Sequence, residues 1–123
     1  MEGRKGRRLG VAAATLATAV LVTSAPAPVM GAASRVRATG NRSWSPRTKS
    51  VAQGTKVVWK NSSGESHNVV SYRGGWSKSS SLPNGSKTSY KFTNSGKYSY
   101  RCTIHSRLDD GKCEGMCGKV KVS

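Results

Sequence analysis

The stretch Gly96-Lys-Tyr-Ser-Tyr-Arg-Cys-Thr-Ile-His105 combines a turn residue, an alternating strand and a Cys-x-x-His pair. Tyr98 and Tyr100 share one face of this segment, because successive side chains of a strand point to opposite faces. The strand pattern ends at Cys102, and His105 lies three residues further along the chain. A Cys-x-x-His pair at the end of a strand is typical of a metal site, whereas this spacing has no particular meaning for a disulfide.

Four further runs of the chain have strand character and are separated by short turns rich in glycine, asparagine and proline. These runs are Lys56–Lys60, His67–Tyr72, Thr88–Phe92 and Gly118–Val122. Frequent short strands broken by such turns predict an all-β fold, either a β-sandwich or a small barrel. Ser34–Ser43 is polar and basic, and it is interpreted either as a flexible approach or as an edge strand. No segment after residue 33 has a helical period.

The N-terminal residues have the composition of an export signal. A basic segment, residues 4–8, precedes the apolar run Val11–Val22, and small residues then end in Gly31-Ala32-Ala33. We predict that residues 1–33 are a signal peptide and that residues 34–123 form one exported domain, which is secreted, periplasmic or associated with the cell wall. The apolar run is shorter than the span of about 20 residues that crosses a membrane. Retention of the run as an uncleaved anchor and twin-arginine export remain open alternatives.

Basic residues dominate the predicted exported domain. Four of the 21 basic residues and one of the five acidic residues lie in the predicted signal, which leaves 17 against four and a formal charge of +13. Such a field attracts anionic partners but does not determine the fold. The cations are spread through the sequence without a recognisable nucleic-acid module, so no nucleic acid is predicted as a partner. An acidic protein, an anionic cell wall or an anionic membrane surface is predicted instead.

Four side chains form a coherent set of metal donors: His67, Cys102, His105 and Met116. Two imidazoles, a thiolate and a thioether are the ligands of electron-transfer copper sites, in which a trigonal His₂Cys plane is completed by a long axial methionine. Sulfur donors suit Cu(I) and imidazoles suit Cu(II), so a site of this kind changes little when one electron moves. The alternatives are a structural histidine, a buried or bridged cysteine, a methionine that fills the core, and a zinc site with overlapping ligand types.

In this order and spacing the segments resemble the cupredoxins, in particular the small plastocyanin- and amicyanin-like blue-copper proteins. The resemblance runs from about Trp44 to Val122. The segments that resemble the family are Trp44-Ser-Pro46, Val51-Ala-Gln-Gly54, Val57-Val-Trp-Lys-Asn61, His67-Asn-Val-Val70, Gly96 to His105, and Met116-Cys-Gly-Lys-Val-Lys-Val122. The resemblance implies a Greek-key β-sandwich that holds one copper ion near one end, with no catalytic residues.

The resemblance also implies roles beyond the four ligands. Asn68 is expected to hydrogen-bond across to the loop around Thr103 and so to fix the orientation of the ligands. His105 is expected to be the exposed ligand through which electrons leave, and Cys102 offers a second route along its strand. Arg107 and Lys112 lie close to this exit in the sequence, which predicts an acidic redox partner.

The chain departs from the family between His105 and Met116, where ten residues, Ser106 to Gly115, replace the usual few. Cys113 and Cys117 flank the methionine, and in an oxidising compartment a bridge between them would leave Cys102 for the metal. Three cysteines nevertheless permit three single bridges. The longer loop leaves open whether Met116 is the axial ligand or the site is three-coordinate. Three carboxylates near this ligand loop are interpreted as a solvated loop face: Asp109, Asp110 and Glu114.

The predicted function is one-electron transfer without catalysis, since two histidines cannot supply the further copper centres that related oxidases and reductases need. Copper storage, delivery or resistance in the same fold is the alternative. A metal-free adhesion module stapled by disulfides is a third possibility, and it requires Cys102 to be bridged.

Overall fold

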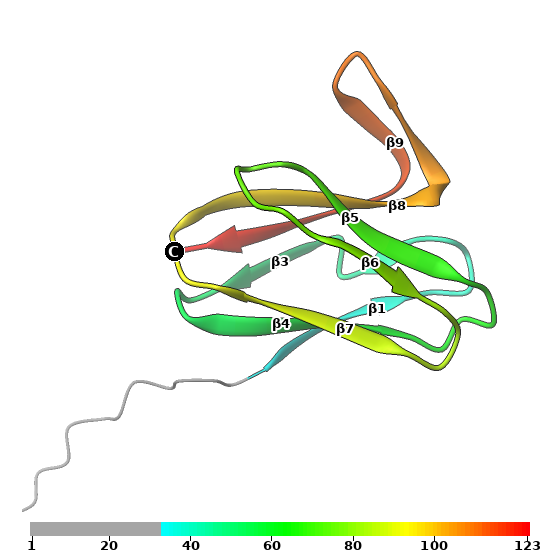
Figure 1. The fold of residues 1–123 in the computed structure, drawn as a ribbon, viewed down its shortest axis with the longest axis horizontal. Coiled ribbons are helices and arrows are strands. Elements are labelled where there is room, and N and C mark those ends of the chain that lie inside the picture. Colours follow the sequence, from blue (N-terminus) through cyan, green and yellow to red (C-terminus); the bar gives the residue numbers. More distant parts are fainter. Residues whose placement is uncertain (1–32) are drawn as a thin grey trace, which may run out of the picture.

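The computed structural model describes residues 33–123, in which strands and turns form two packed sheets (Figure 1). The strands are β1 (Ser34–Ala38), β2 (Trp44–Ser45), β3 (Thr48–Val51), β4 (Thr55–Asn61), β5 (His67–Arg73), β6 (Ser79–Leu82), β7 (Lys87–Phe92), β8 (Gly96–Asp109) and β9 (Lys112–Val122). One sheet has the order β2-β1-β4-β7 and the other has the order β3-β9-β8-β5-β6. The chain passes between the sheets after β2, β3, β4, β6 and β7, as in a Greek-key sandwich. The predicted all-β sandwich is confirmed.

The predicted signal peptide lies outside the described residues, apart from Ala33. Within the part of the chain that the structure describes, no helix is long and apolar enough to cross a membrane.

All five predicted strands are present, and several are longer than the sequence pattern indicates. Ser34–Ala38 forms β1 inside a sheet, between β2 and β4, with Val36 fully buried. The alternative of a flexible approach is therefore wrong for these five residues. The strand alternative is confirmed, and β2 covers the outer side of β1 only at Arg37 and Ala38. Three short strands were not predicted: β2, β3 and β6. The last of these, Ser79–Leu82, is a serine-rich edge strand with a single buried residue, so it lacks the apolar alternation by which strands are recognised.

The ten residues between His105 and Met116 are not an irregular ligand loop. They form a two-stranded hairpin, in which β8 and β9 continue beyond the sandwich (Figure 1). Asp110 and Gly111 form its turn with φ angles of 54° and 77°. Positive φ at both central residues is the mark of the tight hairpin turn that favours Asp-Gly. The expectation of a loop is therefore wrong, because the Asp-Gly pair lets the two arms pair with each other.

Aromatic side chains fill the space between the sheets. The ring of Trp59 on β4 lies 5.2 Å from that of Tyr100 on β8, and Tyr100 in turn lies 5.4 Å from Trp44. Each of these three residues is at most 1% exposed. Edge-to-face contacts of this kind add to the stability gained from buried area. The cluster joins both sheets and reaches the histidine that opens β5, since Trp44 lies 6.3 Å from His67.

We predict that Gly118→Ala destabilises the sandwich. A β-carbon at Gly118 would collide with the buried ring of Tyr100, which has no space to move. Overpacking of a core lowers the free energy of unfolding by about 1–3 kcal/mol. Gly40→Ala is the matched control, because nothing lies within 4 Å of a β-carbon there. Denaturant unfolding of both variants measures the difference, and equal stabilities would contradict the predicted collision.

Candidate metal centre

Three predicted ligands come together at one end of the sandwich, although they lie on two strands. His67 opens β5, and Cys102 and His105 belong to β8. The Nδ1 atoms of the two histidines are 3.1 Å apart, and Cys102 Sγ lies 3.7 Å from Nδ1 of His67 and 3.6 Å from Nδ1 of His105. Among the described residues this is the cluster of His, Cys, Asp or Glu side chains that could hold a metal ion. Cys102 and His67 are buried, and His105 is partly exposed.

The size of this triangle fits a single ion. Ligand distances of about 2.0 Å for nitrogen and 2.3 Å for sulfur place the donors of a trigonal site roughly 3.5–3.7 Å apart. The two sulfur–nitrogen separations match this range, and the nitrogen–nitrogen separation is a few tenths of an ångström shorter. Two imidazole nitrogens and one sulfur are also the donors of an electron-transfer copper plane. The residues present therefore fit copper.

A mismatch between β8 and β9 brings the Cys-x-x-His pair into position. Arg101 pairs with Cys117 and Ser106 pairs with Gly115, so the four residues Cys102–His105 lie opposite Met116 alone. Extra residues on one strand interrupt the ladder and bend it, which redirects the side chains. The Ser106 hydroxyl donates a hydrogen bond to the carbonyl of Cys102 and closes this bulge. Both ends of the Cys-x-x-His segment can therefore turn toward His67.

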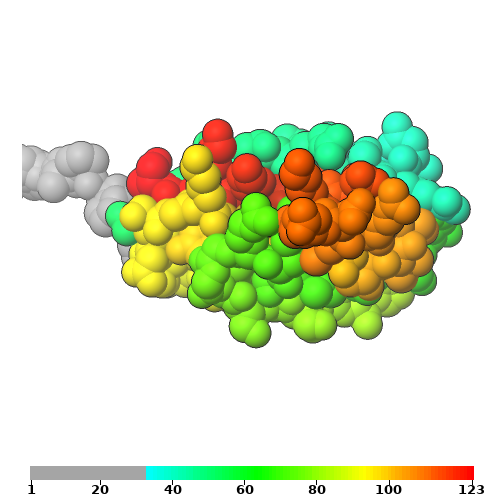
Figure 2. Space-filling model, turned by 90° about the horizontal axis from the view of Figure 1, so that it is seen from above, coloured from blue at the N-terminus to red at the C-terminus, as the bar shows by residue number. Residues whose placement is uncertain are grey.

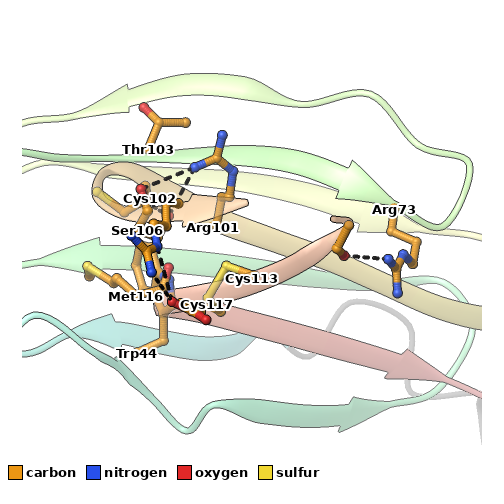
Figure 3. Close-up of a disulfide and its surroundings, with 12 residues drawn as sticks. Trp44, Arg73, Arg101, Cys102, Thr103, Ser106, Cys113, Met116 and Cys117 are labelled. Carbon is orange, nitrogen blue, oxygen red and sulfur yellow. Dashed lines mark hydrogen bonds and ion pairs between the residues drawn. A yellow bond between two sulfur atoms is a disulfide. The ribbon is translucent and has the colours of Figure 1, made fainter. Parts of the chain in front are cut away.

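Met116 lies next to the metal centre because the two arms of the hairpin pair with each other. The arms pair in register from Ser106–Gly115 to Asp109–Lys112, so the chain leaves and re-enters the sandwich at neighbouring points. Met116 is fully buried, and its carbonyl accepts a hydrogen bond of 3.2 Å from Nε1 of Trp44. Figure 3 shows the side chains of Cys102 and Met116 at the same end of the sandwich. The long insertion therefore leaves the methionine opposite the cysteine and histidine.

The disulfide joins Cys113 to Cys117, with a Cα–Cα separation of 6.1 Å, and Cys102 remains a free, buried thiol. Of the three bridges that the sequence permits, this is the one that leaves a thiol beside the two histidines. Both bridged residues lie on β9, on either side of a bend at Gly115, where φ is 104°. A β-carbon on Gly115 would collide with the carbonyl of His105. The bridge spans this bend and fixes the base of the hairpin.

The hairpin is also held at its tip. The guanidinium of Arg73, at the end of β5, donates a hydrogen bond of 2.6 Å to the carbonyl of Gly111 (Figure 3). In the space-filling view the hairpin residues, drawn in orange, lie over one end of the five-stranded face (Figure 2). The hairpin is thus tied to the sandwich at both ends.

Outer polar contacts, a hydrogen bond for His67 and an ion-pair contact for His105, hold both imidazoles by the nitrogen that faces away from the cluster. Nε2 of His67 lies 2.8 Å from the hydroxyl oxygen of Ser63, and Nε2 of His105 lies 3.4 Å from a carboxylate oxygen of Glu65. When Nε2 carries the proton in each ring, both Nδ1 atoms have a free lone pair that points into the cluster. Burial, followed by the neighbouring His105, lowers the pKa of His67 and so favours its neutral form.

Asn61 organises this outer layer and was missed by sequence reasoning. Its side chain is fully buried and makes four hydrogen bonds: it donates to the carbonyls of Glu65 and Leu82 and accepts from the amide and hydroxyl of Ser63. A buried amide with all its hydrogen bonds formed fixes the local chain conformation. The available signal was the polar residue that ends the alternating strand Val57-Val-Trp-Lys-Asn61, six residues before the first histidine.

The expected link between Asn68 and Thr103 is present as two hydrogen bonds. The Asn68 amide nitrogen donates to Oγ1 of Thr103 over 2.8 Å, and the backbone amide of Thr103 donates to Oδ1 of Asn68 over 2.7 Å. Thr103 lies in the bulge, where the ladder to β9 is interrupted. The asparagine therefore satisfies a backbone donor that β9 does not, and it ties β5 to the Cys-x-x-His segment.

An ion pair between Arg42 and Glu65 lies on the outer side of His105. The guanidinium of Arg42 makes two hydrogen bonds to the carboxylate of Glu65, over 3.0 and 3.2 Å. The hydrogen bond from Arg42 is the main cause that lowers the pKa of Glu65, so this carboxylate stays ionised. An anion therefore lies against the more exposed of the two histidines. The sequence gives no sign of this contact, because Arg42 and Glu65 are 23 residues apart.

Comparisons with known proteins agree with this fold and donor set. The family model of copper-binding proteins of the plastocyanin/azurin family matches residues 33–123. A reduced amicyanin variant is 27% identical, with a TM-score of 0.60, and the match covers 75% of this chain and 83% of the other. A purple cupredoxin from Nitrosopumilus maritimus is 24% identical with a TM-score of 0.59, covering 73% of this chain and 99% of that one, and shows the likeness of fold alone.

A copper-containing nitrite reductase from Thermus scotoductus also shares the fold, at 23% identity and a TM-score of 0.61. The match covers 85% of this chain but 25% of the reductase, so this chain corresponds to one part of that protein. No curated protein sequence matches significantly.

The sandwich and its His–Cys–His cluster define a cupredoxin. The chain belongs to the plastocyanin/azurin family of copper-binding proteins, which its family match establishes over the whole described domain. Copper is therefore the cofactor, and the cluster formed by His67, Cys102 and His105 offers it one site.

We predict that Glu65→Gln raises the reduction potential of the copper-loaded protein. A carboxylate near the site stabilises the oxidised, more positive state, and its removal also leaves Arg42 without its partner. One charge at this range corresponds to about 20–60 mV in a largely aqueous environment. Asp109→Asn, near the hairpin tip, is the charge-matched control. Voltammetry of both variants measures the shift, and equal potentials would remove the proposed effect of Glu65.

We predict that the hairpin can be shortened without loss of the metal site. Replacement of residues 107–114 by an Asn-Gly turn, combined with Cys117→Ser, leaves Ser106 and Gly115 as the paired ends of the hairpin. The visible spectrum and copper stoichiometry are expected to stay close to those of the full chain, because Met116 keeps its position. Cys117→Ser alone is the control. A large spectral change confined to the shortened variant would show that the hairpin itself positions the methionine.

Proposed function

We propose that this protein is a one-electron carrier with a mononuclear type 1 copper site. The observation that carries the proposal is the donor triangle of two histidine Nδ1 atoms and one free thiol, with separations of 3.1–3.7 Å, in a chain of a copper-binding family. In this proposal His67, Cys102 and His105 would hold the ion, and Met116 would be a fourth, weaker ligand. Bound copper would cycle between Cu(II) and Cu(I).

The residues around the cluster support fast electron transfer, which requires ligands that move little between the two oxidation states. Both imidazoles are held from outside at Nε2, and the segment that carries the thiol is tied to β5 by Asn68. Cys102 and Met116 are fully buried. A hydrophobic shell and fixed outer hydrogen bonds are the means by which proteins orient ligands and exclude water. In this proposal the protein itself makes and breaks no bonds.

His105 is the proposed exit for the electron. It is the ligand with partial exposure, and it lines a shallow depression with Ser106 and Arg107. The large apolar side chains of Ile104 and Leu108 are exposed on the same segment, at 57% and 41%. A partner that docks here would bring its own redox centre close to the ligand. Cys102 offers the second proposed route, back along β8.

The identity of the redox partner stays a prediction. Arg107 pairs with Glu114 over 2.9 Å, so one of the two hairpin cations expected to attract an acidic partner is partly neutralised. The remaining attraction comes from the net positive charge of the domain. An exported, extracytoplasmic location is supported by the disulfide, because such bridges persist in oxidising compartments.

The copper-loaded protein is predicted to have an intense thiolate-to-copper band in the visible range that bleaches on one-electron reduction. Cys102→Ser is expected to abolish the band, because serine supplies no thiolate. The double variant Cys113→Ser/Cys117→Ser is the matched control, and it should retain the band since its cysteines lie outside the donor cluster. A visible band that survives in Cys102→Ser would contradict the proposed ligand set.

The copper-loaded protein also distinguishes electron transfer from copper storage or delivery, which is the alternative function for this donor set. Line widths in NMR spectra of mixed oxidised and reduced protein measure electron self-exchange. Rapid exchange with constant copper content supports a carrier. Slow exchange together with tight retention of Cu(I) against a competing chelator would favour storage.

A further inference from the structure

The outer face of the four-stranded sheet carries six exposed cations. Each of its three longer strands turns two of them outward, while the alternate residues fill the core. The cations are Arg35 and Arg37 on β1, Lys56 and Lys60 on β4, and Lys87 and Lys91 on β7. We call this set the basic face. In Figure 1 these strands form the lower layer, and Figure 2 looks onto the opposite, five-stranded side.

The strand register places like charges side by side on the basic face. Arg37 pairs with Lys60 and Lys60 pairs with Lys87, which makes an unbroken row of three cations across three strands. A second row contains the pair Lys56 and Lys91. Adjacent strands are about 4.8 Å apart, and like charges directly opposite each other destabilise a sheet. The arrangement therefore opposes folding.

No carboxylate relieves this repulsion within residues 33–123. The ion pairs of this region involve Glu65 near His105 and Glu114 on the hairpin, and no cation of the basic face takes part in one. The other two carboxylates, Asp109 and Asp110, lie at the end of the hairpin. The acidic residues of the described domain therefore lie beside His105 or on the hairpin, and none lies on the basic face. A surface that costs stability and has no internal counter-charge is suited to an external anion.

Two neighbouring depressions lie on this face. One, of about 430 Å³, is lined by Arg35, Arg37, Ser45, Pro46, Lys60 and Ser62. The other, of about 230 Å³, is lined by Ala33, Arg35, Lys56, Val58, Lys60 and Lys87. They share Arg35 and Lys60 in their linings, so they are neighbours on the basic face, and we call the two together the trough. Cations border both depressions, and serine hydroxyls border the first. A trough of two neighbouring depressions suits a chain-like anion better than a single small ion.

We propose that the basic face binds a linear polyol-phosphate polymer, such as a wall-type glycerol-phosphate chain. Phosphate groups spaced along a flexible chain can neutralise successive cations in the trough and release their counterions. The basic face has no exposed aromatic ring on which a nucleic-acid base could stack. It also lacks an apolar anchor for a bilayer, since the exposed large hydrophobic side chains of the described domain are Ile104 and Leu108 at the metal end.

The bound polymer leaves the electron exit free. The basic face is the outer side of one sheet, whereas His105 lies where the β8–β9 hairpin leaves the other sheet. The protein can therefore stay attached to an anionic matrix and still meet a redox partner through its metal end. Binding does not depend on the ion in the metal site, so copper-loaded and metal-free protein bind equally.

The test compares two triple variants that lose the same charge from opposite sheets. Arg35→Gln/Arg37→Gln/Lys60→Gln disrupts the trough, and Lys97→Gln/Lys119→Gln/Lys121→Gln removes three lysines from β8 and β9. Calorimetry with a synthetic glycerol-phosphate oligomer is run at several salt concentrations. The trough variant is expected to lose about tenfold or more in affinity, and its log–log salt slope should fall by about two units. The control variant should lose less than about twofold.

Equal losses in the two triple variants would overturn the proposal, because net charge alone would then explain binding. Tighter binding to phosphatidylglycerol vesicles or to duplex DNA than to the oligomer, at equal phosphate concentration, would overturn it too. Thermal unfolding checks the fold: the trough variant should be at least as stable as the parent chain, since it removes like-charge repulsion. If the triple variant fails to fold, Lys60→Gln alone should still weaken binding, and an unchanged affinity would count against the trough.

Discussion

The unequal pairing of β8 and β9 at the metal end is the constraint on which the rest of the structure depends. Four residues, Cys102–His105, lie opposite the single residue Met116. A regular ladder would point alternate side chains to opposite faces, and Cys102 and His105, an odd number of residues apart, would then diverge. The bulge turns both toward His67. The unpaired backbone that results is satisfied from the neighbouring strand, where Asn68 accepts a hydrogen bond from the amide of Thr103.

Local patterns were sufficient for an all-β fold but left a sandwich and a small barrel open. The resemblance to the cupredoxins indicated the sandwich, and it joined His67 to a Cys-x-x-His pair that lies 35 residues away from it. Alternating residues around Tyr98 predict a strand, and the spacing of Cys102 and His105 indicates a site at its end. The serine-rich edge strand Ser79–Leu82 was missed, since alternation is visible only where one face is apolar. The hairpin was not predicted, because its arms are largely exposed and lack the apolar alternation that marks a strand.

The outer hydrogen bonds of the site could not be predicted in the same way. Ser63 contacts His67 only because buried Asn61 folds the intervening turn, and such a conformation depends on tertiary packing. The contact of Glu65 with His105 joins two segments that the sequence does not relate. Ligands are few and chemically distinctive, whereas their supporting residues are ordinary polar side chains. Only the fold distinguishes these from other surface residues.

The cations of the domain are dispersed along the sequence, but the fold brings six of them together on one face. Cations two or four residues apart on three strands project from one face once the strands pair, which produces the row Arg37, Lys60 and Lys87. The carboxylates lie elsewhere: Glu65 is beside His105, and the other three are on the hairpin. Screening limits exposed charges to about 8 Å at physiological salt, so the metal site responds chiefly to its nearest ionised group, Glu65, which lies 3.4 Å from His105. A strongly basic domain can thus hold an anion on one side without imposing its full positive field on the copper ligands.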